Sequence, residues 1–274
     1  MRNKLVKGLL AASAVVAVVG TANTSDAGVI SIKAENFGNA TDAWNAMQDY
    51  RNGQKAFVDE DFDGIAPGTL TESFVGGLST DVGRFMKGAG ALDGTGACGD
   101  TPQSDCTSPG ILSSLTTPFS GRFNSTDGDS ADPNQNWLDS NDVTQVVWEV
   151  DLAGDNIDFG PHKKITSLGV ILTDVTDVGA EFELTVAGGG SMKTSDVFSG
   201  LGNGTYTFVT AHFQGFIPPI TGFKATFENS NGVTGDGFGI DDATISVPVP
   251  STLALMGAGL VMAGFASRMR RRAA

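Results

Sequence analysis

The chain has 274 residues, of which 31 are acidic and 17 are basic, and its formal net charge is −14. Seven of the basic residues lie near the two ends, so the region between them is more acidic than the chain as a whole. Such a surface repels polyanions, which excludes nucleic acid as a partner and favours solubility or divalent cations.

The first 27 residues have the organisation of a secretory signal peptide. A basic start and an apolar run from about Leu9 to Val19 are followed by small residues up to Ala27. The apolar run is shorter than the roughly 20 residues that a membrane-spanning helix needs. We therefore expect export through the Sec translocon and removal of residues 1–27 by signal peptidase, with Ala22 as the alternative cleavage site.

Residues 28–246 predict one exported domain that begins with a short helix. The stretch TDAWNAMQDYR gives a helix over about 41–52, because Thr41 is a capping residue, Trp44 and Met47 share a face, and Gly53 follows. From Ala56 onward the apolar residues alternate with polar ones, which is typical of strands.

The strand at 145–152, QVVWEVDL, shows this alternation most clearly. Val146, Trp148, Val150 and Leu152 face one way, and the polar residues between them face the other. The sequence therefore predicts an all-β domain, a single β-sandwich. Further candidate strands are AFVDEDF (56–62), FSGRFN (119–124), ITSLGVILT (165–173), EFELTV (181–186), TYTFVTAHF (205–213), FKATFEN (223–229) and FGIDDATIS (238–246).

Two stretches, 87–118 and 124–142, are rich in Gly, Ser, Thr and Asp and read as long loops. The only two cysteines, Cys98 and Cys106, lie in the first of them. In an exported protein we expect these two cysteines to form a local disulfide.

The FGIDDATIS strand breaks its own alternation at Asp241 and Asp242, which predicts a β-bulge there. In the first of the candidate strands listed above and its continuation, VDEDFDG, Asp61 and Asp63 lie on the face opposite Val58 and Phe62. If the first and last strands are neighbours, these four aspartates could form an oxygen-ligand Ca²⁺ site, which would be a structural cofactor. The alternative is that they are solvated or hydrogen-bonded to loop amides. A weaker metal candidate is the set Asp127, Asp129 and Asp132.

Catalytic motifs are missing from the sequence. The two histidines, His162 and His212, lie in unrelated contexts, and no G-x-S-x-G, H-E-x-x-H or P-loop pattern occurs. We therefore predict that the protein is not an enzyme. A hydrolase with two carboxylates stays open as an alternative, because only geometry decides whether two carboxylates face each other.

The C-terminal 28 residues have three parts, a proline-containing motif, an apolar run and a basic tail. The motif is Val247, Pro248, Val249, Pro250 and Ser251, and the tail contains Arg268, Arg270, Arg271 and Arg272. Residues 251–267 span about 25 Å as a helix, so they cross a bilayer only marginally, and the arginines predict a cytoplasmic C-terminus.

This ending resembles the PEP-CTERM sorting signal of Gram-negative bacteria, with Val249 where glutamate is usual. The resemblance implies transient anchoring in the inner membrane with residues 247–274 as the signal. It also implies cleavage by an exosortase-type membrane protease. The stretches DFDGIAPGT, GRFN and GDGFGIDDATIS resemble the exported domain often attached to such signals, which implies a jelly-roll-like sandwich.

The sequence thus favours a non-enzymatic cell-surface or extracellular-matrix protein that works with exopolysaccharide. The alternative is a carbohydrate-binding module, for which Trp137 in the acidic loop is the candidate that we expect to be exposed for stacking on a sugar.

Overall fold

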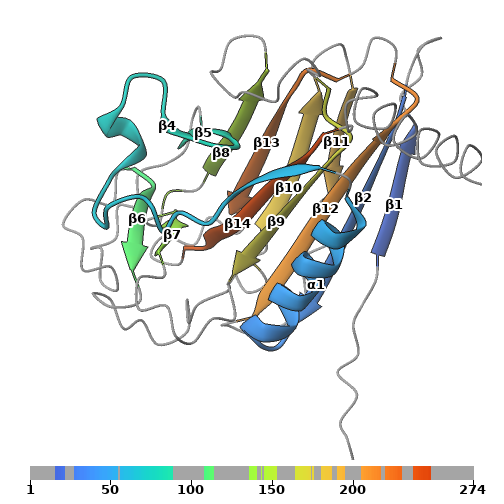
Figure 1. Cartoon of the computed structure of the whole chain (residues 1–274). Helices are drawn as coiled ribbons and strands as arrows, with labels where there is room; N and C mark the ends of the chain where they lie inside the picture. Colours follow the sequence, from blue (N-terminus) through green and yellow to red (C-terminus); the bar gives the residue numbers. More distant parts are fainter. Residues whose placement is uncertain are drawn as a thin grey trace, which may run out of the picture.

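The computed structural model describes residues 16–21, 28–54, 56–88, 108–113, 136–140, 143, 145–152, 164–173, 175, 180–186, 190–194, 205–216, 220–229 and 237–247. In this part the chain forms two antiparallel β-sheets and one α-helix (Figure 1). The prediction of an all-β, sandwich-like domain with one short helix is therefore confirmed.

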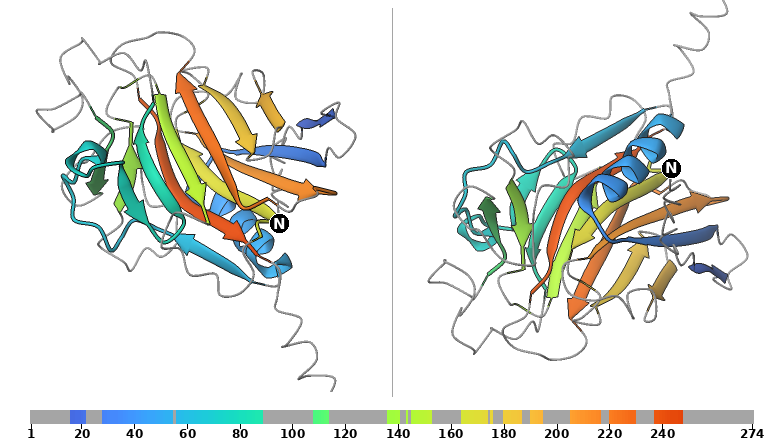
Figure 2. Two further views of the ribbon diagram at one scale, coloured as in Figure 1. Left: turned by 90° about the horizontal axis from the view of Figure 1, so that it is seen from above. Right: turned by 90° about the horizontal axis from the view of Figure 1, so that it is seen from below.

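The larger sheet carries the helix on its outer face, as the two views of Figure 2 show. It has eight described strands, with β3 (Phe57–Glu60) paired to β14 beside the main path. The path runs β1 (Val16–Thr21), β2 (Val29–Phe37), β12 (Tyr206–Gln214), β9 (Ser167–Thr173), β14 (Gly239–Ser246), β7 (Asn136–Asp139) and β6 (Gly110–Ser113).

The smaller sheet packs against the inner face of the larger one. A short 3₁₀ turn, η1 (Thr71–Ser73), precedes its edge strand β4. The six described strands run in the order β11 (Gly190–Thr194), β10 (Ala180–Val186), β13 (Gly222–Asn229), β8 (Gln145–Asp151), β5 (Gly83–Lys87) and β4 (Leu78–Thr80).

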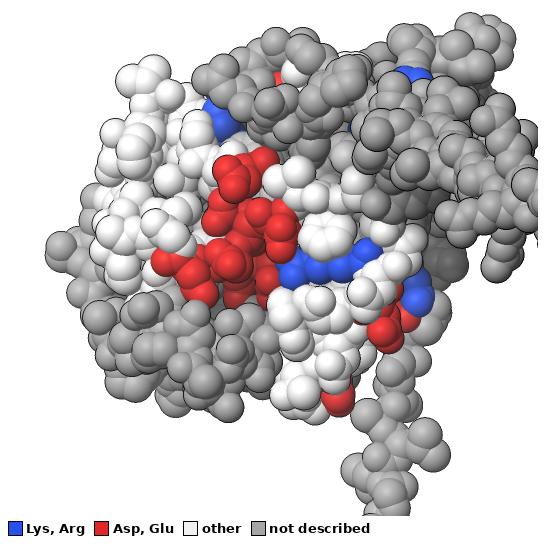
Figure 3. All heavy atoms as spheres, viewed as in Figure 1, with Lys and Arg blue, Asp and Glu red and all other residues white. Residues whose placement is uncertain are grey.

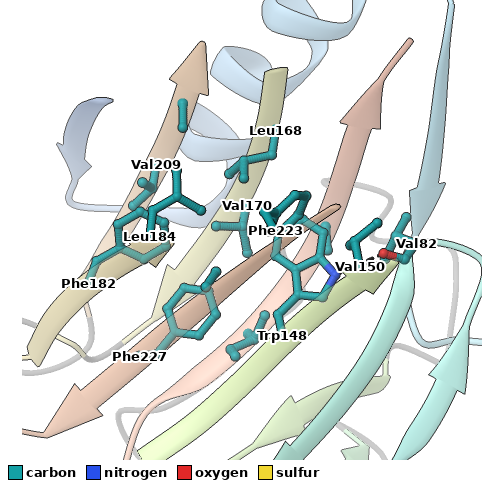
Figure 4. Close-up of a cluster of buried hydrophobic side chains, with 14 of the residues drawn as sticks. Val82, Trp148, Val150, Leu168, Val170, Phe182, Leu184, Val209, Phe223 and Phe227 are labelled. Carbon is teal, nitrogen blue, oxygen red and sulfur yellow. Dashed lines mark hydrogen bonds between the residues drawn. The ribbon is translucent and has the colours of Figure 1, made fainter. Parts of the chain in front are cut away.

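The core lies between the sheets and is centred on Trp148 of β8 (Figure 4). Its ring stacks on Phe85 with centroids 5.6 Å apart and meets Phe223 edge-on at 5.0 Å. Its indole N–H donates a hydrogen bond to the carbonyl of Val82 at 2.9 Å. The polar atom of this large buried ring is thus satisfied, so its full apolar area stabilises the fold. The predicted inward face of 145–152 is confirmed.

The helix α1 (Ala40–Gly53) follows β2 directly. Its N-cap is Asn39, whose side chain accepts a hydrogen bond from the amide of Asp42 at 2.9 Å. The prediction of Thr41 as the cap is wrong by two positions, because the helix begins at Ala40 and the Asn39 oxygen accepts from an amide of its first turn. Ala43 and Met47 are fully buried against the larger sheet, so this face of α1 holds it in place.

Other predictions are corrected or lie outside the described residues. β6 and β7 fall in stretches that the sequence predicted as loops, yet both strands are buried throughout. β1 falls inside the predicted signal peptide. The candidate strand 119–124 and the predicted membrane helix 251–267 lie outside the described residues. Among the helices that are described, none has the length and hydropathy to cross a membrane.

Candidate functional site

A groove lies between α1 and the outer face of the larger sheet. Its volume is about 370 Å³, which falls in the range of roughly 300–1,000 Å³ that is typical of ligand pockets. Three elements contribute to it, the consecutive β2 and α1 and the distant β12. The lining residues are Lys33 and Glu35 from β2, Ala46, Asp49 and Tyr50 from α1, and Phe208, Thr210 and His212 from β12.

Gly169 of β9 allows α1 to approach the sheet closely at this groove. A Cβ atom at this position would lie 2.9 Å from the Tyr50 ring and 3.2 Å from the Phe208 ring. These distances are shorter than ordinary contacts, so any larger residue would push the Tyr50 ring away from the sheet. Gly169 therefore determines how deep Tyr50 lies in the groove.

Tyr50 is held in the groove by hydrogen bonds of its hydroxyl and by contacts of its ring. Its hydroxyl donates to Oγ of Ser167 at 2.8 Å and lies 3.2 Å from Oγ of Ser246. Its ring meets Phe208 and His212 edge-on, with centroid distances of 5.8 and 6.1 Å. Burial raises the pKa of the hydroxyl above 10.0, although the two serine hydrogen bonds oppose the shift. Tyr50 is therefore a neutral phenol at pH 7.

His212 and the charged residues give the groove its polar character. Burial, and secondly the charge of Lys33, lower the pKa of His212 below 6.5, so its imidazole is neutral at pH 7. Lys33 forms an ion pair with Glu35. Asp49 is exposed at the rim. The groove thus offers neutral hydrogen-bonding groups and carboxylates beside aromatic rings, which suits an uncharged polyhydroxylated ligand.

The predicted bulge in β14 is confirmed. The pairing of β14 with β9 shifts between Asp241 and Thr244, and Asp242 has a positive φ of 49°. The condition for bringing the four aspartates together is met at the level of the strands, because β3 pairs with β14 from Ala243↔Glu60 to Ser246↔Phe57.

The buried side chain of Arg51 forms an ion pair with Asp242 in the bulge, where the sequence had predicted a cation held by aspartates. Nη2 of Arg51 on α1 lies 3.3 Å from Oδ1 of Asp242 and 3.4 Å from Oδ2 of Asp59, and its Nε donates to Thr244 at 3.1 Å. The guanidinium also lies over the ring of Trp44, 5.3 Å from its centroid. Sequence reasoning missed Arg51, whose only signal was a basic residue in the last turn of the helix.

The two aspartates after β3 act as acceptors for backbone amides. Oδ1 of Asp61 accepts from the amide of Asp63 at 3.1 Å, and Oδ1 of Asp63 accepts from the amide of Asn136 at 2.7 Å. In β14, Oδ1 of Asp241 accepts from the amide of Asp242 at 2.9 Å. Over the described ranges, no three His, Cys, Asp or Glu side chains are grouped to hold a metal ion, so the four predicted ligands are not brought together.

Acidic side chains gather in one patch beside a basic side chain on the face seen in Figure 3. Glu60, the last residue of β3, is half-buried and accepts hydrogen bonds from the amides of Phe62 at 2.8 Å and Asp81 at 3.3 Å. Burial raises the pKa of Glu60, the two amides oppose the rise, and the nearby Asp61 and Asp81 carboxylates add to it. Glu60 therefore connects the segment that follows β3, at Phe62, to the turn between β4 and β5, at Asp81.

Trp137 is not an exposed stacking platform. It lies on β7, is 2% exposed and packs with Leu112 of β6. The prediction of an exposed Trp137 in a loop is wrong, because strand pairing between β6 and β7 buries this short apolar segment. In the groove beside α1, the half-buried Tyr50 is the aromatic ring that reaches the surface, whereas Phe208 below it is only 4% exposed.

Several predicted residues lie outside the described part of the chain. These are the two cysteines, Cys98 and Cys106, and the whole C-terminal signal after Val247. The loop aspartates at 127, 129 and 132 and His162 also lie outside it.

Residues 246–272 match the family described as the PEP-CTERM protein-sorting motif, which confirms the resemblance found in the sequence. No curated protein and no solved structure shows significant similarity to this chain. A PEP-CTERM motif implies export, anchoring in a membrane before processing, and cleavage by an exosortase-type membrane protease. The chain therefore carries a PEP-CTERM sorting signal and is an exported protein sorted by an exosortase-type system.

Proposed function

We propose that this protein is a non-enzymatic component of the cell surface or extracellular matrix of a Gram-negative bacterium. The match at residues 246–272 supports the surface location in this proposal, because it assigns the chain to an export and sorting route. The non-enzymatic role rests on the missing catalytic motifs in the sequence. In the proposed route, the Sec translocon exports the chain and signal peptidase cuts after Ala27. The helix at 251–267 then anchors the jelly-roll-like domain in the inner membrane, with the C-terminus in the cytoplasm.

The intact mass of the protein released from the cell surface tests this route. The expected product begins at Gly28 and ends near Pro250, because the exosortase removes the apolar helix and the arginines. Val249→Glu restores the residue usual at this position and should leave the cleavage site unchanged. A released protein that still carries Arg268 and the residues after it would contradict the proposal.

For the exported domain we propose exopolysaccharide as the partner, and the groove between α1 and the larger sheet favours a carbohydrate-binding function. The half-buried ring of Tyr50 offers apolar surface, and the half-buried His212 offers a neutral hydrogen-bonding group. Phe208 and Thr210 are buried beneath them and form the floor of the groove. An uncharged sugar presents the matching combination of apolar faces and hydroxyls. The acidic rim at Asp49 disfavours a polyanionic glycan.

Pull-down of the purified protein on insoluble neutral polysaccharides tests the binding function. Asp49→Ala should reduce retention several-fold, because this carboxylate lines the groove. Asn45→Ala is the matched control, since Asn45 is exposed on the same helix and does not line the groove. Equal retention of both variants would show that the groove is not the binding site.

A carboxylate-pair hydrolase is the remaining alternative, because Glu35 and Asp49 line the same groove. Binding is favoured over hydrolysis, since a general acid needs an apolar environment that keeps it protonated. Asp49 is exposed instead, and Glu35 is paired with Lys33. Release of reducing ends from a polysaccharide, abolished in both Glu35→Gln and Asp49→Asn, would support the hydrolase and overturn the non-enzymatic assignment.

A further inference from the structure

The outermost strand of the larger sheet belongs to the segment that export should remove. β1 (Val16–Thr21) lies inside the predicted signal peptide and covers the edge of β2 over six residue pairs, from Val16↔Ala34 to Thr21↔Val29. Among the described strands of the larger sheet, only β1 lies beyond β2. Cleavage after Ala27 would therefore make β2 the edge strand of the mature domain.

An uncovered β2 edge is well suited to pairing with another strand. β2 has nine residues, contains no proline, and directs Ile30, Ile32 and Ala34 into the core. Its freed N–H and C=O groups form a template of the kind that natural proteins usually cover or shorten. The pairing with β1 shows that this edge accepts an antiparallel strand along most of its length.

The charges on β2 are self-complementary. Lys33 and Glu35 lie on the same outer face, two positions apart, on either side of Ala34. In an antiparallel pairing of two β2 strands centred on Ala34, each Lys33 lies directly opposite the Glu35 of the other copy. Opposite charges stabilise such cross-strand positions and like charges destabilise them. A register centred on Lys33 would place two lysines face to face.

We propose that the mature protein forms a symmetric dimer in which the β2 strands of two copies pair antiparallel, with Ala34 at the two-fold axis. The proposal rests on removal of residues 1–27 and does not depend on the ligand of the groove. The smaller sheet also ends, in β11, at this side of the molecule (Figure 2). A two-fold axis of this kind makes each copy contribute the same surface.

This arrangement has a consequence for the groove. An antiparallel pair within one sheet keeps the same face of both copies on the same side, so both α1 helices lie on one face of the joined sheet. Lys33 and Glu35 line the groove of each copy, so the two grooves meet at the axis. The dimer would thus present one continuous binding surface in place of two separate ones.

Light scattering during size-exclusion chromatography of the surface-released protein tests the dimer. We expect twice the mass that mass spectrometry gives for one processed chain. A monomer at micromolar concentration, or a released chain that retains residues 1–27, would overturn the proposal.

A charge exchange tests the register. Lys33→Glu and Glu35→Lys should each dissociate the dimer, because like charges then face each other across the axis. An equimolar mixture of these two variants should form a mixed dimer, since every cross-strand pair again joins opposite charges. Melting curves verify that each variant is folded. Single variants that remain dimeric, or a mixture that remains monomeric, would exclude pairing centred on Ala34.

Discussion

The guanidinium of Arg51 lies 3.3 Å from a carboxylate oxygen of Asp242, although 191 positions separate the two residues in the chain. Arg51 is 6% exposed and Asp242 is 1% exposed, so the pair joins α1 to the bulge of β14 out of contact with solvent. A buried carboxylate requires a cation or a donor, and here a protein side chain supplies it. This contact leads to the first two predictions.

Replacing Arg51 should strongly destabilise the domain. Arg51→Met keeps much of the side-chain volume but leaves the Asp242 carboxylate buried without its cation, which typically costs about 3–5 kcal/mol. Urea unfolding measures the loss. Asp59→Asn is the matched control, because Asp59 is half exposed and an ion pair of that kind contributes about 0–1 kcal/mol. Similar losses in both variants would show that the buried pair has no special role.

Substitutions at Asp242 should separate its charge from its backbone conformation. Asp242→Asn removes the charge and keeps a residue that tolerates the positive φ of 49°. Asp242→Val removes the charge and also places a β-branched residue there, at an additional cost of about 1–3 kcal/mol. Equal unfolding free energies for the two variants would contradict a strained bulge.

The stability of the domain should depend on the protonation of His212. Burial and Lys33 lower its pKa below 6.5 in the folded state, so the unfolded chain binds the proton more strongly. The free energy of unfolding therefore falls as the pH decreases through the unfolded-state pKa of about 6.5 toward the lower folded-state pKa, and this contribution is constant at higher pH. Thermal unfolding at a series of pH values should show a smaller loss in His212→Gln.

The controls for this prediction use Lys33 and direct titration. Lys33→Met removes the positive charge near His212 and should raise the pKa of the imidazole, which NMR measures directly. An imidazole that titrates at or above 6.5 in the wild-type protein would contradict the prediction.

Gly169→Ala should perturb the groove and lower stability together. The new methyl group would meet the Tyr50 ring at 2.9 Å, and overpacking of this kind costs about 1–3 kcal/mol. Gly38→Ala is the control, because no atom lies within 4 Å of a Cβ at that position. A crystal structure of Gly169→Ala with an unmoved Tyr50 ring would show that the close approach is not limiting.

Calcium should have little effect on stability, since the described aspartates already have protein partners. Asp242 is bound by Arg51, and Asp63 accepts from the amide of Asn136. We expect the same melting temperature with added Ca²⁺ and with EDTA. A clear increase in the melting temperature with Ca²⁺ would contradict this expectation and would support a calcium site of the kind predicted from the sequence.

The alternation of apolar residues predicted the strands of the core, because one buried face imposes a period of two. Val146, Trp148 and Val150 follow this pattern and are buried as expected. The break in the alternation at Asp241 and Asp242 also predicted the bulge. In contrast, β6 and β7 are four residues each and are buried completely, so no alternation distinguishes them from their Gly- and Ser-rich neighbours.

The groove could not be predicted because its residues come from three elements that meet only in the folded protein. His212 was the only groove residue that the sequence singled out, and it was considered only for catalysis. Tyr50 was part of a predicted helix, but nothing local indicated that its ring would lie over Gly169. Arg51 was missed for the same physical reason, since its partner Asp242 lies on the last strand.

The last strand also limits where the sorting protease can act. β14 lies inside the larger sheet and ends at Ser246, the first residue of the matched motif, and the amide of Val247 still donates to the carbonyl of Ala56 at 3.1 Å. Ser246 and Ser251 are at most roughly 18 Å apart in an extended chain. With the membrane helix proposed at 251–267, the folded domain would therefore rest against the membrane surface while it is anchored. A protease that cuts near Pro250 would have to bind the few residues between the folded domain and the membrane helix. The released protein would then end only a few residues after β14.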